Sequence, residues 1–306
     1  MMNSSLGDLN ATENYDGYNN AREHTEQLTL SDVEVILWRG IILMVCCIGF
    51  VGNGYIIWLL GFQMKRNCFT TFILNLAIAD FWFLTFIVIY FIYAFINMLE
   101  GILGFICSSL SHMMYVNAHF LMTAISIDRC VAVLFPIWHR CSRPKYLSPA
   151  VCVFLWIASF LLVGTVDIMM VTKLILNDSL SSLYFLVTAI VCLPLITLST
   201  VVLFIKVCIK SNQKNQGRLL LMILITLLCF LILSFPLSVF AVIASFFSIE
   251  HETKLGYLIL LFSCLNSSIN PVIYFLVGRK KGARSKESMK VRLQNVFKEG
   301  EATGGR

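Results

Sequence analysis

An acidic and a basic residue stand side by side at the end of a long apolar segment, at Asp128 and Arg129. On insertion scales each charge costs roughly 2.5–3.5 kcal/mol at the centre of a bilayer, so a charge in such a segment usually serves a function. A guanidinium group does not deprotonate in proteins, so Arg129 stays cationic, and Asp128 is its nearest counter-charge. The pair therefore predicts a functional site at the end of this segment. The alternative is an ion pair that only holds a membrane bundle together.

Other apolar segments also contain polar residues, at Asn53, Asp80 and the Asn270-Pro271 pair. An unpaired carboxylate at membrane depth is very unfavourable, so Asp80 needs hydrogen-bond partners, a cation or a proton. Pro271 and Pro236 each remove a backbone hydrogen bond and kink their helices. Kinked helices with polar groups at the kinks can have two packings of similar energy, which a switch requires. A static bundle held together by hydrogen bonds is the alternative.

The elements that must position these residues are membrane-spanning helices. The 306 residues are 58% hydrophobic and 13% charged, whereas about a quarter of the residues in a soluble domain are charged. The apolar runs are about twenty residues long, enough to cross a bilayer, and they do not alternate with polar residues, which favours helices over a barrel. We predict an all-α bundle of seven spans, at Ile36–Phe62, Thr70–Ile96, Leu103–Val133, Pro149–Thr172, Tyr184–Ile209, Arg218–Ser248 and Leu255–Val277.

The distribution of charge predicts how these spans cross the membrane. The net charge of +6 indicates topology and not nucleic-acid binding, because most basic residues fall in alternate loops and in the tail, while acidic residues crowd the N-terminus. Basic residues stay cytoplasmic, so we expect a multi-pass plasma-membrane protein with its N-terminus outside and its C-terminus inside. Three regions follow: a disordered extracellular leader (1–35), a seven-span domain (36–277) and a cytoplasmic tail (278–306).

Both ends of the chain carry signals of their own. The polar, acidic leader predicts disorder and has no apolar signal-peptide core, so the first span would direct insertion. Asn3 and Asn10 are predicted glycan acceptors, and Asn177 in the second outer loop is a third. In the tail, apolar residues at helical spacing among lysines and arginines predict a basic amphipathic helix on the lipid bilayer, with Met289, Leu293, Val296 and Phe297 on its apolar face.

Eleven cysteines are present, but their positions do not predict a disulfide framework. Six lie within spans, and four lie at the inner side, where thiols stay reduced. Only Cys107 approaches the outer face, and the leader and outer loops contain no partner for it. We interpret the cysteines as small apolar packing residues.

These motifs together resemble the class A, rhodopsin-like G-protein-coupled receptors from about residue 36 to residue 298. The residues that carry the resemblance are Gly52-Asn53, Asn75 to Asp80, Asp128-Arg129-Cys130, Trp156, Pro194, Pro236 and Asn270 to Tyr274. Within that class the chain is similar to the Mas-related receptors. The stretches that carry this second similarity are Ala124 to Cys130, Pro136 to Lys145 and Asn266 to Gly278.

The resemblance implies a receptor, not an enzyme, which converts binding of an extracellular ligand into activation of a heterotrimeric G protein. It assigns the coupling switch to Asp128, Arg129, Phe230, Pro236, Asn270, Pro271 and Tyr274. It also implies a possible allosteric sodium ion at Asp80, Asn266, Ser267 and Asn270. The chain departs from the family pattern at Ser234, where helix 6 usually has a tryptophan, at Val202, where helix 5 usually has a tyrosine, and at Ala118, where helix 3 usually has a hydroxyl. We therefore expect an activation relay through Phe230 and Tyr274 alone, or one loose enough for basal signalling.

The extracellular ligand is predicted from charge. Ser111 replaces the aspartate of amine receptors, and Cys264 replaces the retinal lysine of opsins. Asp167 lies eleven residues, about three helical turns, beyond Trp156, so the two share a helix face and Asp167 lies near the outer boundary. With Asp178 and other acids at the outer rim, it favours a cationic peptide or a small amine-like molecule. The alternative for each acid is a solvated loop charge.

Two other functions are alternatives to signalling. A channel or transporter would need polar residues along a continuous path, and the intramembrane charges here are concentrated at Asp80 and the Asp128-Arg129 pair, too sparse for a conduction path. A non-signalling partner of another receptor is the second alternative. The chain has no catalytic triad, metal cluster or phosphate-binding loop of its own.

Overall fold

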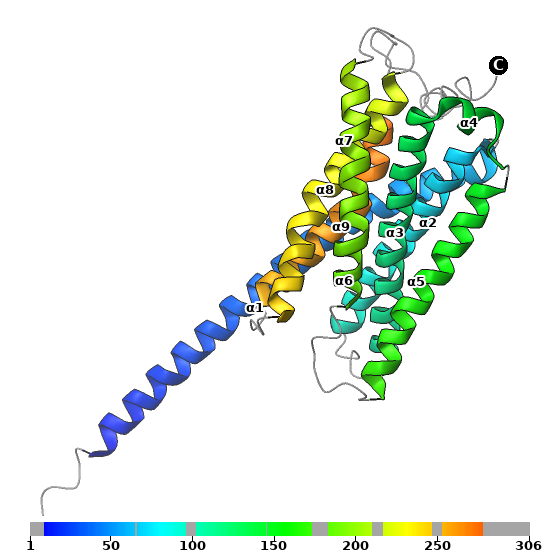
Figure 1. Cartoon of the computed structure of the whole chain (residues 1–306). Coiled ribbons are helices and arrows are strands. Elements are labelled where there is room, and N and C mark those ends of the chain that lie inside the picture. The colour runs from blue at the N-terminus through cyan, green and yellow to red at the C-terminus, as the bar shows by residue number, and fades with distance from the viewer. Residues whose placement is uncertain are drawn as a thin grey trace, which may run out of the picture. The chain divides into compact units, whose positions relative to one another are not determined.

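A computed structural model describes residues 9–64, 66–95, 102–144, 146–172, 183–209, 217–246 and 253–277. Within these ranges the chain is helical apart from short turns, and it contains no strand. Figure 1 shows the elements, which in chain order are α1 (Leu9–Trp58), η1 (Leu59–Gln63), α2 (Cys68–Phe95), α3 (Ile102–Leu134), α4 (Pro136–Cys141), α5 (Leu147–Val171), α6 (Leu183–Val187), η3 (Thr188–Cys192), α7 (Leu193–Ile209), α8 (Gly217–Phe246) and α9 (Thr253–Val277).

The long helices match the seven predicted spans. Six segments within the described residues are long and apolar enough to cross a membrane, and α8 adds a shorter apolar segment, Leu220–Ser234. The predicted fifth span comprises α6, η3 and α7 together. The all-α, seven-helix prediction is therefore confirmed. The predicted amphipathic helix of the tail lies outside the described residues.

The first helix differs from its predicted extent. It begins at Leu9, within the leader for which composition predicts disorder, and continues to Trp58 without a break. The leader contains no proline and several good helix formers, among them Ala21, Arg22, Glu23 and Leu28, so backbone hydrogen bonds can continue through it. Contacts divide the chain into two compact units, Met1–Leu43 and Met44–Arg306. All contacts described below lie within the second unit. The boundary at residue 35 stays a prediction, since it concerns where the chain enters a membrane.

The helices of the second unit pack around a continuous apolar core. α3 runs alongside α2, α5 and α7, and α8 runs alongside α7 and α9 (Figure 1). Fully buried side chains from five helices meet there, including Leu76, Leu121, Ile196, Met222 and Phe230. Polar contacts made by Trp156 and Ser159 help to tie α5 to its neighbours. The indole Nε1 of Trp156 donates to Oδ1 of Asn75 on α2 at 3.0 Å, and Oγ of Ser159 donates to Oδ1 of Asn117 on α3 at 3.3 Å.

Pro194 distorts the helix of the predicted fifth span. Pro194 lies at the start of α7, directly after the π-helical turn η3. A proline has no backbone N–H, and its ring clashes with the carbonyl four residues earlier, here that of Ile190. A π-helical turn accommodates such a break inside an otherwise continuous helix. All eleven cysteines are free, as predicted, and Sγ of Cys46 lies 3.7 Å from Sγ of Cys264.

Gly49 allows α1 to approach α9 closely. A Cβ atom on Gly49 would collide with Oγ of Ser268 and with Leu84, and Ser268 is itself held in place by donating to the carbonyl of Val45 at 3.1 Å. We expect Gly49→Ala to lower the free energy of unfolding by about 1–3 kcal/mol, the usual cost of overpacking. The measurement is the melting temperature of the purified protein in detergent.

Gly164→Ala is the matched control, because no atom lies within 4 Å of its added Cβ. We expect this control to leave the melting temperature unchanged or slightly raised, since alanine favours a helix over glycine. Equal melting temperatures for the two variants would contradict the close packing of α1 against α9.

Candidate functional site

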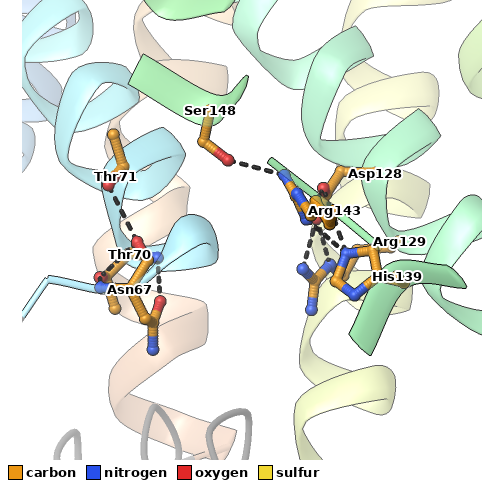
Figure 2. Close-up of polar contacts among 8 residues, drawn as sticks. All are labelled: Asn67, Thr70, Thr71, Asp128, Arg129, His139, Arg143 and Ser148. Carbon is orange, nitrogen blue, oxygen red and sulfur yellow. Dashed lines mark hydrogen bonds and ion pairs between the residues drawn. The ribbon is translucent and has the colours of Figure 1, made fainter. Parts of the chain in front are cut away.

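The Asp128-Arg129 pair lies in the last turns of α3, at the end of the bundle beside α4, which we call the α4 end. Both residues are largely buried, and Arg129 is 8% exposed. Nε of Arg129 donates to Oδ2 of Asp128 at 3.0 Å, and Nη2 of Arg129 donates to the same oxygen. Figure 2 shows this contact at the centre of a larger polar cluster. The cation therefore lies against its neighbour's carboxylate and not in solvent.

Two further groups from beyond α3 reach the same carboxylate (Figure 2). Nη1 of Arg143 lies 2.6 Å from Oδ1 of Asp128, and Nε2 of His139 lies 3.5 Å from that oxygen. Nη2 of Arg143 donates to Oγ of Ser148 at 2.6 Å, at the start of α5. Arg143 thus connects α3, the segment after α4, and α5.

The short helix α4 places these groups. Pro136 begins α4, where its missing N–H costs nothing because the first turn has unpaired donors anyway. His139 and Arg143 are four residues apart and in direct contact with each other. The sequence placed His139 and Arg143 only within the stretch Pro136 to Lys145 that resembles the Mas-related receptors, and it assigned neither residue a role at the site. The signal that could have found them is this four-residue spacing after a helix-starting proline.

The N-terminus of α2 provides a further contact to Arg129, through Phe69. Asn67 caps this helix, because the backbone N–H of Thr70 donates to Oδ1 of Asn67 at 2.7 Å and the N–H of Asn67 donates to Oγ1 of Thr70 at 2.8 Å (Figure 2). The cap fixes the first turn and with it Phe69. The Cζ atom of Arg129 lies 4.4 Å from the centroid of the Phe69 ring, a cation–π contact.

The ionic cluster consists of Asp128, Arg129, His139 and Arg143, with Phe69 beside it. It holds two permanent cations, Arg129 and Arg143, against the carboxylate of Asp128. Charge-assisted hydrogen bonds of this kind are stronger than neutral ones. Removing the carboxylate would leave two guanidinium groups close together without a counter-charge. The cluster is not suited to catalysis, since it contains no nucleophile held by a base. It is suited to restraining Arg129 in one position, from which a change of helix packing can release it.

A second polar group lies midway along the bundle. Nδ2 of Asn270 donates to Oδ2 of Asp80 at 2.9 Å, and both side chains are buried. Nδ2 of Asn53 donates to the carbonyls of Gly49 and Ser267, each at 3.0 Å. These contacts join α1, α2 and α9 at the level of Pro271, where the helix hydrogen bonds are interrupted.

The sodium ion implied by the family resemblance would meet oxygen ligands in this group. Oδ1 of Asn266 is buried and has no hydrogen-bond partner among the described residues, and it is the kind of oxygen that a hard cation prefers. Ser267 and Asn270 are buried nearby on the same helix, and Asp80 supplies the only negative charge of the four. The donor set therefore fits such an ion. Among the described residues, no three His, Cys, Asp or Glu side chains lie close enough together to hold a metal ion on their own.

The path between the two ends of the bundle contains a histidine that sequence reasoning missed. His119 on α3 packs with its ring 4.1 Å from that of Tyr115 and 4.9 Å from that of Phe230, in both cases between centroids. Phe230 and Tyr274 are both buried, and Tyr274 borders a small cavity of about 10 Å³ between α3, α8 and α9. A ring stack of Tyr115, His119 and Phe230 therefore joins α3 to α8, and it includes Phe230, one of the two residues of the predicted relay.

The far end of the bundle from α4 contains a cavity of about 260 Å³, which we call the far cavity. Its walls come from α2, α3, α6 and α9 and combine aromatic and aliphatic side chains with hydroxyl groups from Ser108, Ser111 and Ser263. Ser111, a predicted ligand residue, lies in this wall, and its Oγ donates to the carbonyl of Ser108 at 2.7 Å. Tyr115 also lines the cavity, so the ring stack begins at its floor.

Asp167 is not among the residues that line the far cavity. It accepts a hydrogen bond from Oγ of Ser109 and interacts electrostatically with His112, which does line the cavity. The predicted acid therefore lies one layer behind the wall. Asp178, Asn3 and Asn177 lie outside the described residues. Asn10 belongs to α1 and Pro236 to α8.

Comparison with known proteins identifies the family. A family model described as 7 transmembrane receptor (rhodopsin family) matches residues 52–274. The chain is 35% identical to the human proto-oncogene Mas over 87% of its own length and 84% of that protein. It is 34% identical to the human Mas-related G-protein coupled receptor member D, over 97% and 94% of the two chains, and 34% identical to human member X1, over 84% and 81%. The chain therefore belongs to the Mas-related branch of the rhodopsin-like G-protein-coupled receptors, which are multi-pass membrane receptors and not enzymes.

Proposed function

We propose that this receptor binds a ligand at the far cavity and promotes nucleotide exchange on a heterotrimeric G protein at the α4 end. The observation that carries the proposal is the position of Arg129, a permanent cation held against Asp128 at the end of α3. Family membership supports the same pairing of an extracellular ligand with an intracellular G protein. The direct test is nucleotide exchange by the reconstituted receptor.

The proposed switch is a change in helix packing that turns Arg129 away from Asp128. Pro236 allows α8 to bend away from α3 and opens a space at the α4 end. Arg129 then faces the C-terminal helix of the G protein, and Tyr274 moves into the space behind it. A ligand drives this change only by binding one packing more tightly than the other. The ring stack of Tyr115, His119 and Phe230 is the route by which the far cavity biases α8.

The ligand of this proposal is a cationic peptide or a small amine-like molecule. The far cavity holds about 260 Å³, which suits one side chain or a small amine better than a whole peptide. Its aromatic wall, which includes Phe83, Tyr90 and Tyr115, can attract a cation through ring faces. Asp167 supplies negative charge behind the wall, and the outer-loop acids predicted from the sequence extend that charge to the rim.

Asp167→Asn should weaken a cationic ligand. Because Asp167 lies behind the wall, the change removes a through-space attraction and not a hydrogen bond; at an effective dielectric constant of about 20 this attraction is worth roughly 1.4 kcal/mol, so potency should fall by about tenfold. The measurement is the concentration response of a basic peptide selected on the unmutated receptor. Ser109→Ala is the matched control, because it removes the hydrogen-bond partner of Asp167 and keeps the negative charge. Unchanged potency in Asp167→Asn at normal surface expression would exclude Asp167 from the site.

The same proposal includes a sodium ion, which would act as an allosteric ligand of the receptor. Asp80, Asn266, Ser267 and Asn270 would hold it between α2 and α9, where it would favour one helix packing over the other. The buried, unpartnered Oδ1 of Asn266 supports this assignment. Ala118 contributes no oxygen at the position where relatives usually have a hydroxyl.

The proposed topology places the N-terminus outside and the α4 end in the cytoplasm. We expect glycans on Asn3 and Asn10, and on Asn177 if the second outer loop is accessible to the transferase. An epitope tag placed after Arg306 should stain only in permeabilised cells, and a tag before Met1 should stain in intact cells. Deglycosylation should also increase the mobility of the receptor in a gel. Staining of the C-terminal tag on intact cells would contradict the charge-based topology.

A further inference from the structure

A further cavity lies at the α4 end, on the side of the bundle where α3, α4 and α5 meet. It encloses about 520 Å³, within the roughly 300–1,000 Å³ range of small-molecule pockets. Its walls are almost entirely apolar, with Phe72, Phe120, Leu155 and Ala158 among them. Side chains on its rim are exposed, Phe154 by 67% and Trp138 by 45%, so the cavity opens toward the lipid that surrounds a membrane bundle. We call it the α3–α5 groove.

One end of the groove is charged. Asp128, His139 and Arg143 line it there, and Arg129 is bound to Asp128 directly behind. Two guanidinium groups and one carboxylate give this end a net positive charge, whatever the protonation of His139. The occupant that complements both parts of the groove is therefore an amphiphile with an apolar chain and an anionic head.

Arg143 has a hydrogen-bond donor available for such an anionic head group. Its side chain is 6% exposed, Nη1 contacts Asp128 and Nη2 contacts Ser148. Nε is buried and has no hydrogen-bond partner among the described residues. Leaving a buried donor unpaired costs about 1–3 kcal/mol, which a bound acceptor would recover. Nε is enclosed in this conformation, so a carboxylate reaches it after a rotation of the guanidinium group, while Nη1 remains near Asp128.

We propose that the α3–α5 groove binds a single-chain anionic amphiphile, a long-chain fatty acid, taken from the surrounding membrane leaflet. The chain lies along the apolar wall formed by α3 and α5, and the carboxylate accepts hydrogen bonds from Arg143 beside His139. The site is separate from the far cavity and needs no G protein. It places a lipid-derived anion on the same arginine that holds Asp128.

The test is equilibrium binding of radiolabelled oleate to the full-length receptor in nanodiscs of neutral phosphatidylcholine. We expect saturable binding at one site per receptor. Unlabelled oleate should displace the label at least tenfold more effectively than oleyl alcohol, which has the same chain without the charge. Arg143→Gln should weaken oleate binding at least tenfold, and Arg143→Lys should restore part of it.

A second variant separates loss of the site from loss of folding. Ala158→Trp should fill the groove and abolish saturable binding without touching the ionic cluster. Ile157→Trp is its matched control, because Ile157 is the next residue on α5, is 54% exposed and does not line the groove. Both variants must keep the melting temperature of the unmutated receptor.

Three results would overturn the proposal. They are binding that never saturates, equal displacement by oleate and oleyl alcohol, and equal binding by Ala158→Trp and Ile157→Trp. Equal displacement would assign the groove to neutral lipid chains. Binding of labelled oleate that never saturates would mean that oleate only partitions into the lipid of the nanodisc.

Discussion

Arg129→Ala should abolish or strongly reduce ligand-driven nucleotide exchange while leaving ligand binding at the far cavity nearly intact. Arg129 is the only permanent cation on the described part of α3, and in the proposed active packing it faces the G protein. Alanine can neither carry this charge nor donate hydrogen bonds. The far cavity lies at the other end of α3, and Arg129 does not line it.

Two readouts on the same membranes test this expectation. Binding of a fluorescent basic peptide, selected on the unmutated receptor, should change by less than about threefold, within the scatter of ordinary surface substitutions. Nucleotide exchange driven by that peptide should fall to the level without receptor. Arg66→Ala is the control for general loss of positive charge, since Arg66 is a described arginine near the same end that is exposed and absent from the ionic cluster. Full exchange by a well-expressed Arg129→Ala receptor would leave the pair with a structural role only.

Asp128→Asn should raise basal activity in the absence of ligand. The neutral asparagine side chain would not compensate the guanidinium groups of Arg129 and Arg143, which both contact the carboxylate at present. Removing one partner of a buried ion pair leaves the other charge uncompensated and destabilises the packing that contains it. A shift of about 1.4 kcal/mol toward the active packing would raise a small active fraction tenfold. The measurement is ligand-free nucleotide exchange, normalised to receptor number.

Arg143→Gln provides a graded comparison for this prediction. It removes one cation from the cluster but keeps the contact between Asp128 and Arg129, so basal activity should rise less than in Asp128→Asn. Ser126→Ala is a matched control two residues before Asp128 on α3, because the Oγ of Ser126 donates to the carbonyl of Thr123 at 2.7 Å and belongs to no contact of the ionic cluster among the described residues. A basal rate in Asp128→Asn no higher than in Ser126→Ala would show that the cluster does not restrain the switch.

The sequence was sufficient to predict the architecture and the location of the charged pair. Continuous apolar runs leave few alternatives to membrane helices, because every backbone polar group in lipid must be paired within its own segment. The cost of burying charge singled out Asp80, Asp128 and Arg129 for the same reason. Free cysteines also followed from their placement in and beside the spans.

The partners of Asp128 beyond Arg129 were harder to predict. His139 and Arg143 reach the carboxylate only because α4 turns the chain back beside α3, and a six-residue helix has little sequence signal of its own. The contact of Phe69 with Arg129 depends on how α2 packs against α3, which no local pattern encodes. Long-range packing, and not propensity, decides these contacts.

At the far cavity, too, the contacts depend on helix packing that the sequence does not show. Helical spacing placed Asp167 on the face of Trp156, but the rotation of α5 sets it behind the cavity wall, against Ser109. The sequence showed that helix 6 has no tryptophan, yet it did not indicate that His119 packs between Tyr115 and Phe230. Only the packed bundle shows this contact between α3 and α8.

The most direct test of the switch requires no known ligand. The receptor is reconstituted in nanodiscs and mixed with one purified heterotrimeric G protein at a time from a panel. The receptor is present at a far lower concentration than the G protein, and the rate of nucleotide exchange is measured. Three forms are compared: Asp128→Asn, the double variant Asp128→Asn with Arg129→Ala, and empty nanodiscs. The account predicts that Asp128→Asn accelerates exchange on at least one class of G protein, and that adding Arg129→Ala returns the rate to that of empty nanodiscs. Acceleration that survives the loss of Arg129, or no acceleration of any class by a folded Asp128→Asn receptor, would contradict it.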